Sequence, residues 1–130
     1  STDEELLYWD TEIGKQITSA SSVRDVKWHT SRCVLGWGVQ GIWPAFSDAT
    51  DVNTCDRSPD GSLLATGDDF HTVKLFKYPC IKPKSKYKSY KGHSEHVPSV
   101  RFSNDGKSLI SVGGIDKAII QYNVKYPKDK

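Results

Sequence analysis

The stretch Ser58–Gly67, which reads SPDGSLLATG, decides the fold because it returns as Ser103–Gly113, SNDGKSLISVG. The two copies are offset by 45 residues at their serines and by 46 at their glycines. Downstream, Val73–Phe76 (VKLF) aligns with Ile119–Tyr122 (IIQY) at the same spacing. A period of about 40–45 residues with four short strands per unit is typical of a β-propeller blade.

Turn chemistry supports the same interpretation. The tripeptides 59–61 (Pro-Asp-Gly) and 104–106 (Asn-Asp-Gly) lie between short apolar runs. Asp and Asn tolerate a left-handed backbone and Gly has no Cβ to clash, so these tripeptides predict a hairpin between the first and second strands. Glycine and aspartate at 67–69 and 113–116 mark the next turn. No stretch shows sustained 3.6-residue apolar periodicity, so we expect an all-β chain with little or no helix.

A fainter third copy precedes these two. Val23, Val26 and Trp28 have the spacing of Val97, Val100 and Phe102, and Val39–Trp43 aligns with a third strand. This copy is compressed, because Trp43 and Val52 are nine positions apart whereas Phe76 and Val97 are twenty-one apart. We therefore expect an atypical blade.

The chain begins within yet another unit, with Leu6–Asp10 as a third strand and Gly14–Ser19 as an outer strand. The expected fold is about three four-stranded antiparallel blades of a partial propeller. Closure needs at least four blades, so the rest of the propeller is expected in a longer parent chain. The predicted organisation is the end of a preceding blade (1–22), the atypical blade (23–50), a full blade (51–91), a final blade (92–126) and a tail (127–130).

Composition excludes several classes of function. A net charge of +2 over 130 residues gives no general nucleic-acid-binding surface. No apolar run reaches the length of a membrane span, and the acidic start does not resemble a secretory signal. The three cysteines, Cys33, Cys55 and Cys80, are far apart and form no Cys-x-x-Cys pair. This pattern favours reduced thiols in the cytosol over disulfides or a zinc site.

Several motifs carry a family resemblance. Gly92-His93, Asp116 and Tyr122 follow the WD-repeat pattern, with Tyr122 where tryptophan is usual. More specific are the segments GVQGIWP (38–44), ATGDDF (65–70), KLFKYPC (74–80) and GHSEHV (92–97). In this order they resemble the C-terminal blades of the second propeller in the echinoderm microtubule-associated protein-like family, over about residues 6–124.

The resemblance implies a non-enzymatic scaffold of the microtubule cytoskeleton, located in the cytoplasm, that binds tubulin and needs no cofactor. The alternative is a generic WD-repeat adaptor for another protein or peptide. The resemblance also implies that His93, Asp116 and Tyr122 form a structural hydrogen-bonded network. In the full blade at 51–91, Phe70 or His71 falls at the position of the network aspartate, so we expect an incomplete network there.

Two clusters permit a chemical interpretation. His93, Glu95 and His96 suggest a metal site, but a zinc site usually needs three or four converging ligands, which favours pairing of His93 with Asp116 instead. Asp68, Asp69 and His71 suggest an acid–base pair, but aspartates in a turn commonly accept hydrogen bonds from the local backbone. No nucleophile motif and no converging nucleophile–base set is evident, so no catalytic residue and no metal ligand is assigned.

Two surfaces remain as candidates for partner binding. The segment 82–91 (KPKSKYKSYK) is either a solvated outer strand protected from edge pairing by its lysines or a dock for an acidic partner such as tubulin. Its candidate residues are Lys82, Lys84, Lys86, Tyr87, Lys88, Tyr90 and Lys91. Trp37, Trp43 and Phe46 are secondary interface candidates, although aromatic side chains more often fill cores and blade seams.

Overall fold

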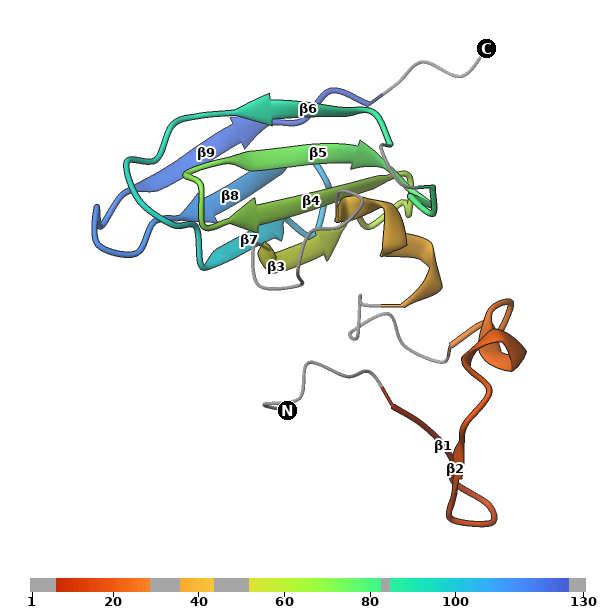
Figure 1. Ribbon diagram of the computed structural model, residues 1–130. Helices are drawn as coiled ribbons and strands as arrows, with labels where there is room; N and C mark the ends of the chain where they lie inside the picture. Colours follow the sequence, from red (N-terminus) through yellow and green to blue (C-terminus); the bar gives the residue numbers. More distant parts are fainter. Residues whose placement is uncertain (1–6, 29–35, 44–51, 83–84, 127–130) are drawn as a thin grey trace.

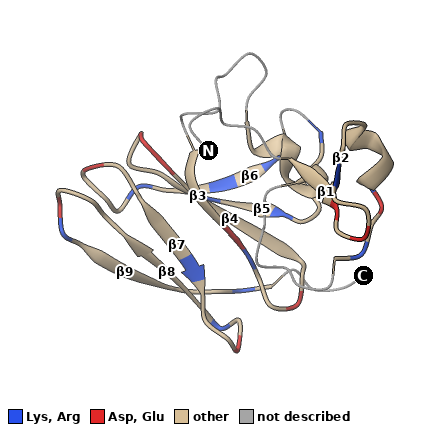
Figure 2. Ribbon diagram, turned by 90° about the horizontal axis from the view of Figure 1, so that it is seen from below, with Lys and Arg blue, Asp and Glu red and all other residues tan. Residues whose placement is uncertain are grey.

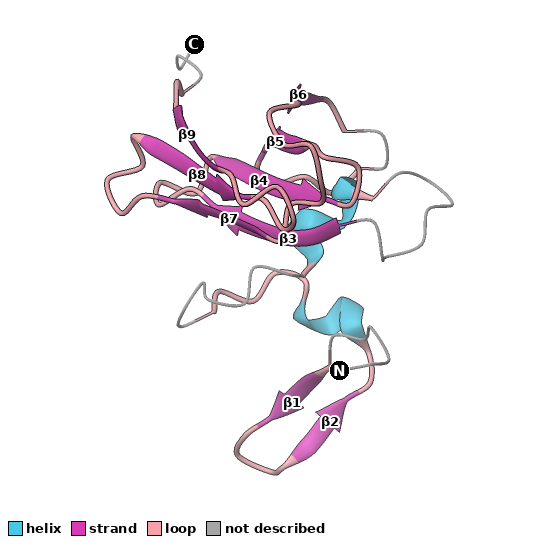
Figure 3. Cartoon of the chain, turned by 90° about the vertical axis from the view of Figure 1, so that its left-hand side faces the viewer, coloured by secondary structure: helices cyan, strands magenta, loops and turns pink. Residues whose placement is uncertain are grey.

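The computed structural model describes residues 7–28, 36–43, 52–82 and 85–126. Its strands form three separate antiparallel sheets, and Figure 1 shows the two larger sheets side by side, with the smallest hairpin apart from them. The described residues contain no α-helix, only the two 3₁₀ helices η1 (Ala20–Val23) and η2 (Trp37–Ile42). The expectation of an all-β chain with little helix is therefore confirmed (Figure 3).

The central blade has four strands in the order β3 (Val52–Arg57), β4 (Leu63–Asp68), β5 (Val73–Lys77) and β6 (Tyr87–Tyr90). The next sheet has three, β7 (Ser99–Phe102), β8 (Ser108–Val112) and β9 (Ile119–Asn123). At the start of the chain, β1 (Tyr8–Asp10) pairs with β2 (Lys15–Ile17). These two strands lie where the third and outer strands of a preceding blade were predicted.

The repeated hairpins are alike at the level of single hydrogen bonds. The hydroxyls of Ser58 and Ser103 each donate to the aspartate two residues on, at 2.6 Å in both copies. Gly61 and Gly106 take positive φ angles of 76° and 71°, which glycine adopts without steric cost. The pairing register makes Leu64 equivalent to Leu109 and Thr66 equivalent to Ser111, since Leu64 pairs with Phe76 and Leu109 with Tyr122.

The atypical segment differs from the prediction. A third strand was expected over 39–43, but the structure has η2 there, so this prediction is wrong. The backbone of η2 bonds to the loop that follows β5, with Gly41 N–H donating to the Cys80 carbonyl at 2.7 Å and Cys80 N–H donating to the Gly38 carbonyl at 2.6 Å. The remaining parts of this blade, 29–35 and 44–51, lie outside the described residues.

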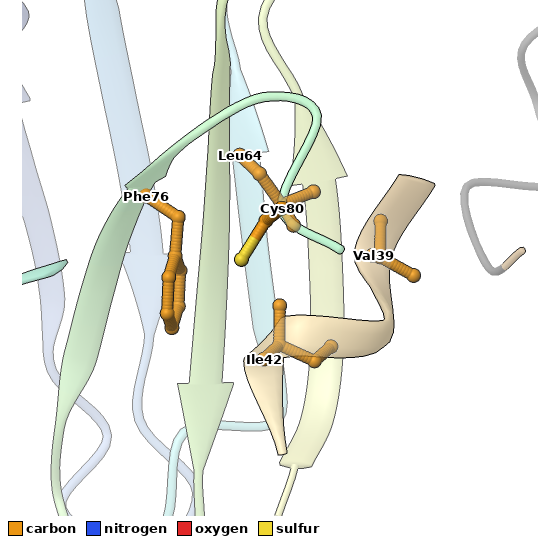
Figure 4. Close-up of a cluster of buried hydrophobic side chains, with 5 residues drawn as sticks. All are labelled: Val39, Ile42, Leu64, Phe76 and Cys80. Carbon is orange, nitrogen blue, oxygen red and sulfur yellow. The ribbon is translucent and has the colours of Figure 1, made fainter. Parts of the chain in front are cut away.

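A 3₁₀ turn brings residues three apart onto one face, and here those residues are Val39 and Ile42. Both are buried in a cluster with Leu64, Phe76 and Cys80, shown in Figure 4. Each large apolar side chain buried in this way contributes about 1.5–3 kcal/mol. The cluster therefore holds η2 against one face of the central blade without a strand pairing.

The opposite face of the central blade packs on the final sheet. Ala65, Val73, Val97, Val100 and Leu109 form the buried core between them. Hydrogen bonds also cross this seam, among them one from Phe102 N–H to the Asp56 carboxylate at 2.8 Å, one from Val97 N–H to the Asp68 carbonyl at 2.9 Å and one from the Arg101 guanidinium to the Cys55 carbonyl at 3.4 Å. The described part of the chain thus contains one complete blade-to-blade junction.

Candidate functional site

A buried hydrogen-bonded network ties the β6–β7 connection to the final sheet. His93 Nδ1 lies 3.1 Å from Asp116 Oδ2, and His93 Nε2 lies 2.7 Å from Ser111 Oγ. Because an ionised carboxylate only accepts hydrogen bonds, Nδ1 carries the proton towards Asp116, and Nε2 accepts from the Ser111 hydroxyl. The three side chains come from a loop, a strand and a turn, so the network fixes these elements relative to one another.

Asp116 is held by the turn that carries it. It accepts from Ala118 N–H at 2.9 Å and from Ser94 N–H at 3.0 Å. These backbone donors, the first the stronger, together with His93 hold the pKa of Asp116 below its usual value of 3.8. The carboxylate is therefore ionised near neutral pH and anchors the imidazole. The next residue, Lys117, has a positive φ of 54°, which closes the turn.

The order Ser111–His93–Asp116 resembles the nucleophile–base–orienting set of hydrolases in its hydrogen bonding. The prediction that no nucleophile and base lie close together is therefore wrong, because Ser111 and His93 are within hydrogen-bonding distance. The Ser111 side chain, however, points into the seam between blades and is 0% exposed, so no substrate reaches its hydroxyl. Burial favours a structural role for these residues over hydrolysis.

Tyr122 is near this network but not part of its hydrogen bonding, which corrects the sequence-based expectation. Its hydroxyl is buried and has no hydrogen-bond partner among the described residues. Its ring instead packs against Tyr90, with the centroids 5.6 Å apart. A phenol carries its polar group at the far end of the ring, whereas an indole carries N–H on its side, so Tyr122 contributes packing in place of a hydrogen bond.

The central blade closes the equivalent turn differently. Phe70, which replaces the network aspartate, is 64% exposed. Asp68, two positions earlier, is buried and accepts from Phe70 N–H and Thr72 N–H, both at 2.9 Å. Lys74 Nζ lies 3.8 Å from the other Asp68 oxygen. The interpretation of Asp68 as a turn residue therefore fits the structure. Its buried carboxylate, paired with Lys74, closes the β4–β5 turn of the central blade.

The basic segment forms the outermost strand of the central blade. All four residues of β6 are exposed, as are Lys82, Lys86 and Lys91, while Lys84 lies outside the described residues. Figure 2 shows the lysines of β6 and β5 at this edge. The two tyrosines are on opposite faces, since Tyr87 packs on Phe76 at 5.3 Å between ring centroids and Tyr90 packs on Tyr122. The described lysines of this segment are therefore exposed, and each tyrosine is used partly for packing.

The aromatic candidates lie at the seam beside η2. Trp43 packs against the cluster of Leu64 and Phe76, and its indole N–H is buried without a hydrogen-bond partner in the part of the chain that is described. Trp37 is half-buried, and its indole N–H donates to the Ala20 carbonyl at 2.9 Å. Phe46 lies outside the described residues. These placements favour the seam over an exposed interface.

The candidate metal ligands do not converge. His93 is engaged with Asp116 and Ser111, and His96 lies at the surface, 3.9 Å from Glu95. Within the described ranges, no three His, Cys, Asp or Glu side chains form a group suited to a metal ion. None of the helices there is both long and apolar enough to cross a membrane.

Comparison with known proteins decides the family. A family model described as the second β-propeller of echinoderm microtubule-associated protein matches residues 1–124. The chain belongs to this family. It is 52% identical over 124 residues to the 77 kDa echinoderm microtubule-associated protein of Lytechinus variegatus, covering 95% of this chain and 19% of that protein. It is 50% identical over 124 residues to echinoderm microtubule-associated protein-like 2 of Rattus norvegicus, with the same coverage.

A human relative, echinoderm microtubule-associated protein-like 3, is 46% identical over 125 residues, which are 95% of this chain and 14% of that protein. The chain thus spans a fifth or less of the length of these relatives. Membership of the echinoderm microtubule-associated protein family confirms the resemblance inferred from the motifs. It also confirms the assignment of the sheets to a WD-repeat β-propeller.

The sequence pattern did not single out Ser111, and it predicted Asp68 as a turn residue but not as the replacement for the network aspartate. Ser111 holds the imidazole of His93, and Asp68 closes the turn of the central blade. A signal for Ser111 was present, since the register places a hydroxyl residue at the same site in both copies, Thr66 and Ser111. No such signal marks Asp68, because the final blade has no equivalent aspartate and uses Asp116 to close its turn.

Proposed function

We propose that this chain is part of a non-enzymatic WD-repeat scaffold of the microtubule cytoskeleton and contributes to tubulin binding and microtubule organisation in the cytoplasm. Its family is a scaffold type without catalysis, and its relatives are named as microtubule-associated proteins. The buried Ser111–His93–Asp116 network fits this function as a structural element. The rest of the propeller, supplied by the parent chain, completes the binding surface.

The position of β6 carries this proposal. The strand lies at the outer edge of the central blade, and its residues Tyr87–Tyr90 are all exposed. Lys88 on β6 is therefore exposed to solvent, as are Lys82, Lys86 and Lys91 in the segments before and after the strand. A basic surface of this kind attracts the acidic surface of tubulin, with an attraction that weakens as salt is added.

Charge reversal tests the proposal. Lys86→Glu with Lys88→Glu is expected to weaken tubulin binding about tenfold at low salt, because exposed ion pairs contribute about 0.2–1 kcal/mol each and reversal adds repulsion. The matched control is Lys27→Glu with Lys125→Glu, two exposed lysines outside β6. Equal tubulin affinity in the β6 variant and the control would exclude β6 as a docking surface.

A second candidate function is that of an adaptor for another protein or peptide. The observation in its favour is a pair of exposed apolar side chains on equivalent loops, Phe70 between β4 and β5 and Ile115, 73% exposed, between β8 and β9. Phe70→Ser with Ile115→Ser is expected to leave tubulin binding intact. Loss of tubulin binding in this variant would move the contact from β6 to this end of the blades.

A further inference from the structure

Ser89 is the central serine of the basic edge. It lies in β6, the last strand of its sheet, which is hydrogen-bonded to β5 on one side. Lys86 and Lys88 precede it and Lys91 follows, and all are exposed. Within the part of the chain that is described, the Ser89 hydroxyl makes no hydrogen bond. A nucleophilic hydroxyl is thus presented on extended backbone with lysines close by in sequence, although Lys88, which pairs with Leu75, projects from the opposite face of β6.

Ser85 provides the contrast within the same segment. It also has lysines close by, Lys82 before it and Lys86 after it. Its hydroxyl, however, donates to the carbonyl of Lys82, and the residue is half-buried. The two serines therefore share a basic sequence context and differ in the availability of the hydroxyl.

We propose that Ser89 is a phosphorylation site for a basophilic serine/threonine protein kinase, and that the phosphate switches off the basic surface of β6. Such kinases select lysine or arginine side chains near the acceptor through acidic groups in their peptide groove. In the reaction, Ser89 Oγ forms a bond to the γ-phosphorus of a nucleoside triphosphate. The bond from that phosphorus to the bridging oxygen breaks, the nucleoside diphosphate leaves, and the hydroxyl proton passes to the kinase base. The identity of the affected partner rests on the proposed function, whereas the modification itself does not.

The charge change is large for so small a surface. A phosphoserine carries about −1.5 to −2 charges near neutral pH, which offsets about half to two-thirds of the charge on Lys86, Lys88 and Lys91. An acidic partner then meets a surface whose net charge has fallen from +3 to about +1 to +1.5, with three new acceptor oxygens on β6. Phosphorylation therefore opposes docking by the same electrostatics that favour it in the unmodified protein.

The sheet register supplies an internal acceptor for the phosphate. Ser89 is paired with Lys74 on β5, so their side chains share one face of the sheet. Lys74 Nζ now lies 4.8 Å from the centre of the Tyr87 ring and 3.8 Å from Asp68. A phosphate on Ser89 draws this ammonium group towards β6, which keeps the modified strand paired with β5.

Site mapping is the first test. The full chain is incubated with a basophilic kinase and ATP, and the modified residue is located by mass spectrometry. Phosphate on Ser89 is expected in the wild type and in Ser85→Ala, and none in Ser89→Ala. Phosphate on Ser85 in place of Ser89, or none in the 82–91 segment, overturns the proposal.

Binding is the second test, with a poly-glutamate peptide as probe and tubulin as a separate ligand. Phosphorylation of Ser89 is expected to weaken poly-glutamate binding about tenfold at low salt. Unchanged poly-glutamate binding overturns the switch. If the unmodified chain binds poly-glutamate but not tubulin, the proposed function fails while a phosphate-sensitive basic surface remains, so the two failures are distinguishable.

Discussion

The imidazole of His93 is fixed between two oxygen atoms from different elements, Asp116 Oδ2 at 3.1 Å and Ser111 Oγ at 2.7 Å. This relationship connects the entry to β7, the middle of β8 and the β8–β9 turn. The network therefore fixes the final sheet and the loop that enters it, while the junction between the blades is held by apolar packing and by hydrogen bonds such as those from Phe102 N–H and Val97 N–H.

Ser111→Ala is expected to destabilise the chain by about 1–3 kcal/mol, because it leaves the buried Nε2 of His93 without a donor. Urea unfolding monitored by tryptophan fluorescence measures the change. The matched control is Ser94→Ala, since Ser94 reaches Asp116 through its backbone N–H and not through its hydroxyl. An equal loss of unfolding free energy in both variants would mean that the Ser111 hydroxyl has no special role in stability.

Acid is expected to remove the contribution of three aspartates. Hydrogen bonds from Ser58, from Ser103 and from Ala118 N–H are the main causes that hold the pKa values of Asp60, Asp105 and Asp116 below 3.8. Because the folded pKa is lowered, this stability is fully present above about pH 3.8 and is lost as the pH falls through the folded values. The penalty of Asp116→Asn should therefore shrink below that pH in urea midpoints. A penalty that grows on acidification would contradict the assignment.

Gly41→Ala is expected to displace η2 and cost about 1–3 kcal/mol through overpacking. A Cβ at Gly41 would clash with the backbone carbonyl of Lys82 and approach that of Cys80 to 2.9 Å. Gly36→Ala serves as control, because its nearest neighbour is Tyr8 Oη at 3.9 Å and its φ of 167° is ordinary extended backbone. Similar thermal midpoints for the two variants would show that η2 is not held by this contact.

The outer face of the final sheet is expected to make the chain self-associate. Ile110 and Ile119, 37% and 74% exposed, occupy the positions of Ala65 and Val73, which the neighbouring sheet buries fully in the central blade. Ile110→Thr with Ile119→Thr should lower the average mass at high concentration in sedimentation experiments. Ile13→Thr, an exposed isoleucine of the β1–β2 hairpin, should not. A concentration-independent monomer in the wild type would contradict this expectation.

Local chemistry made most of the fold predictable. The repeated Ser-x-Asp-Gly turns at 58–61 and 103–106 carry their own hydrogen bonds, so the sequence alone places these hairpins and the strands they join. The segment at 37–42 was mispredicted because its valine, isoleucine and tryptophan are common in strands. Its backbone partners, Cys80 among them, are distant in sequence, and propensity does not report them.

The candidate site was predictable only in part. His93 and Asp116 follow from the repeat pattern, whereas the failure of the Tyr122 hydroxyl to join them depends on the exact reach of a phenol ring. The substitution of Asp68 for the missing aspartate in the central blade also depends on geometry, since two adjacent aspartates differ only in which one is buried. The lysine-rich edge was readable from sequence because exposure of an outer strand needs no long-range information.

The central claim is that these blades carry part of a tubulin-binding surface. Light scattering of the chain, alone and with soluble tubulin at low salt, tests it most directly. We expect a rise in mass on mixing that corresponds to a complex and that disappears in Lys86→Glu with Lys88→Glu. Masses that remain those of the separate proteins, under conditions in which the chain is folded by circular dichroism, would contradict it.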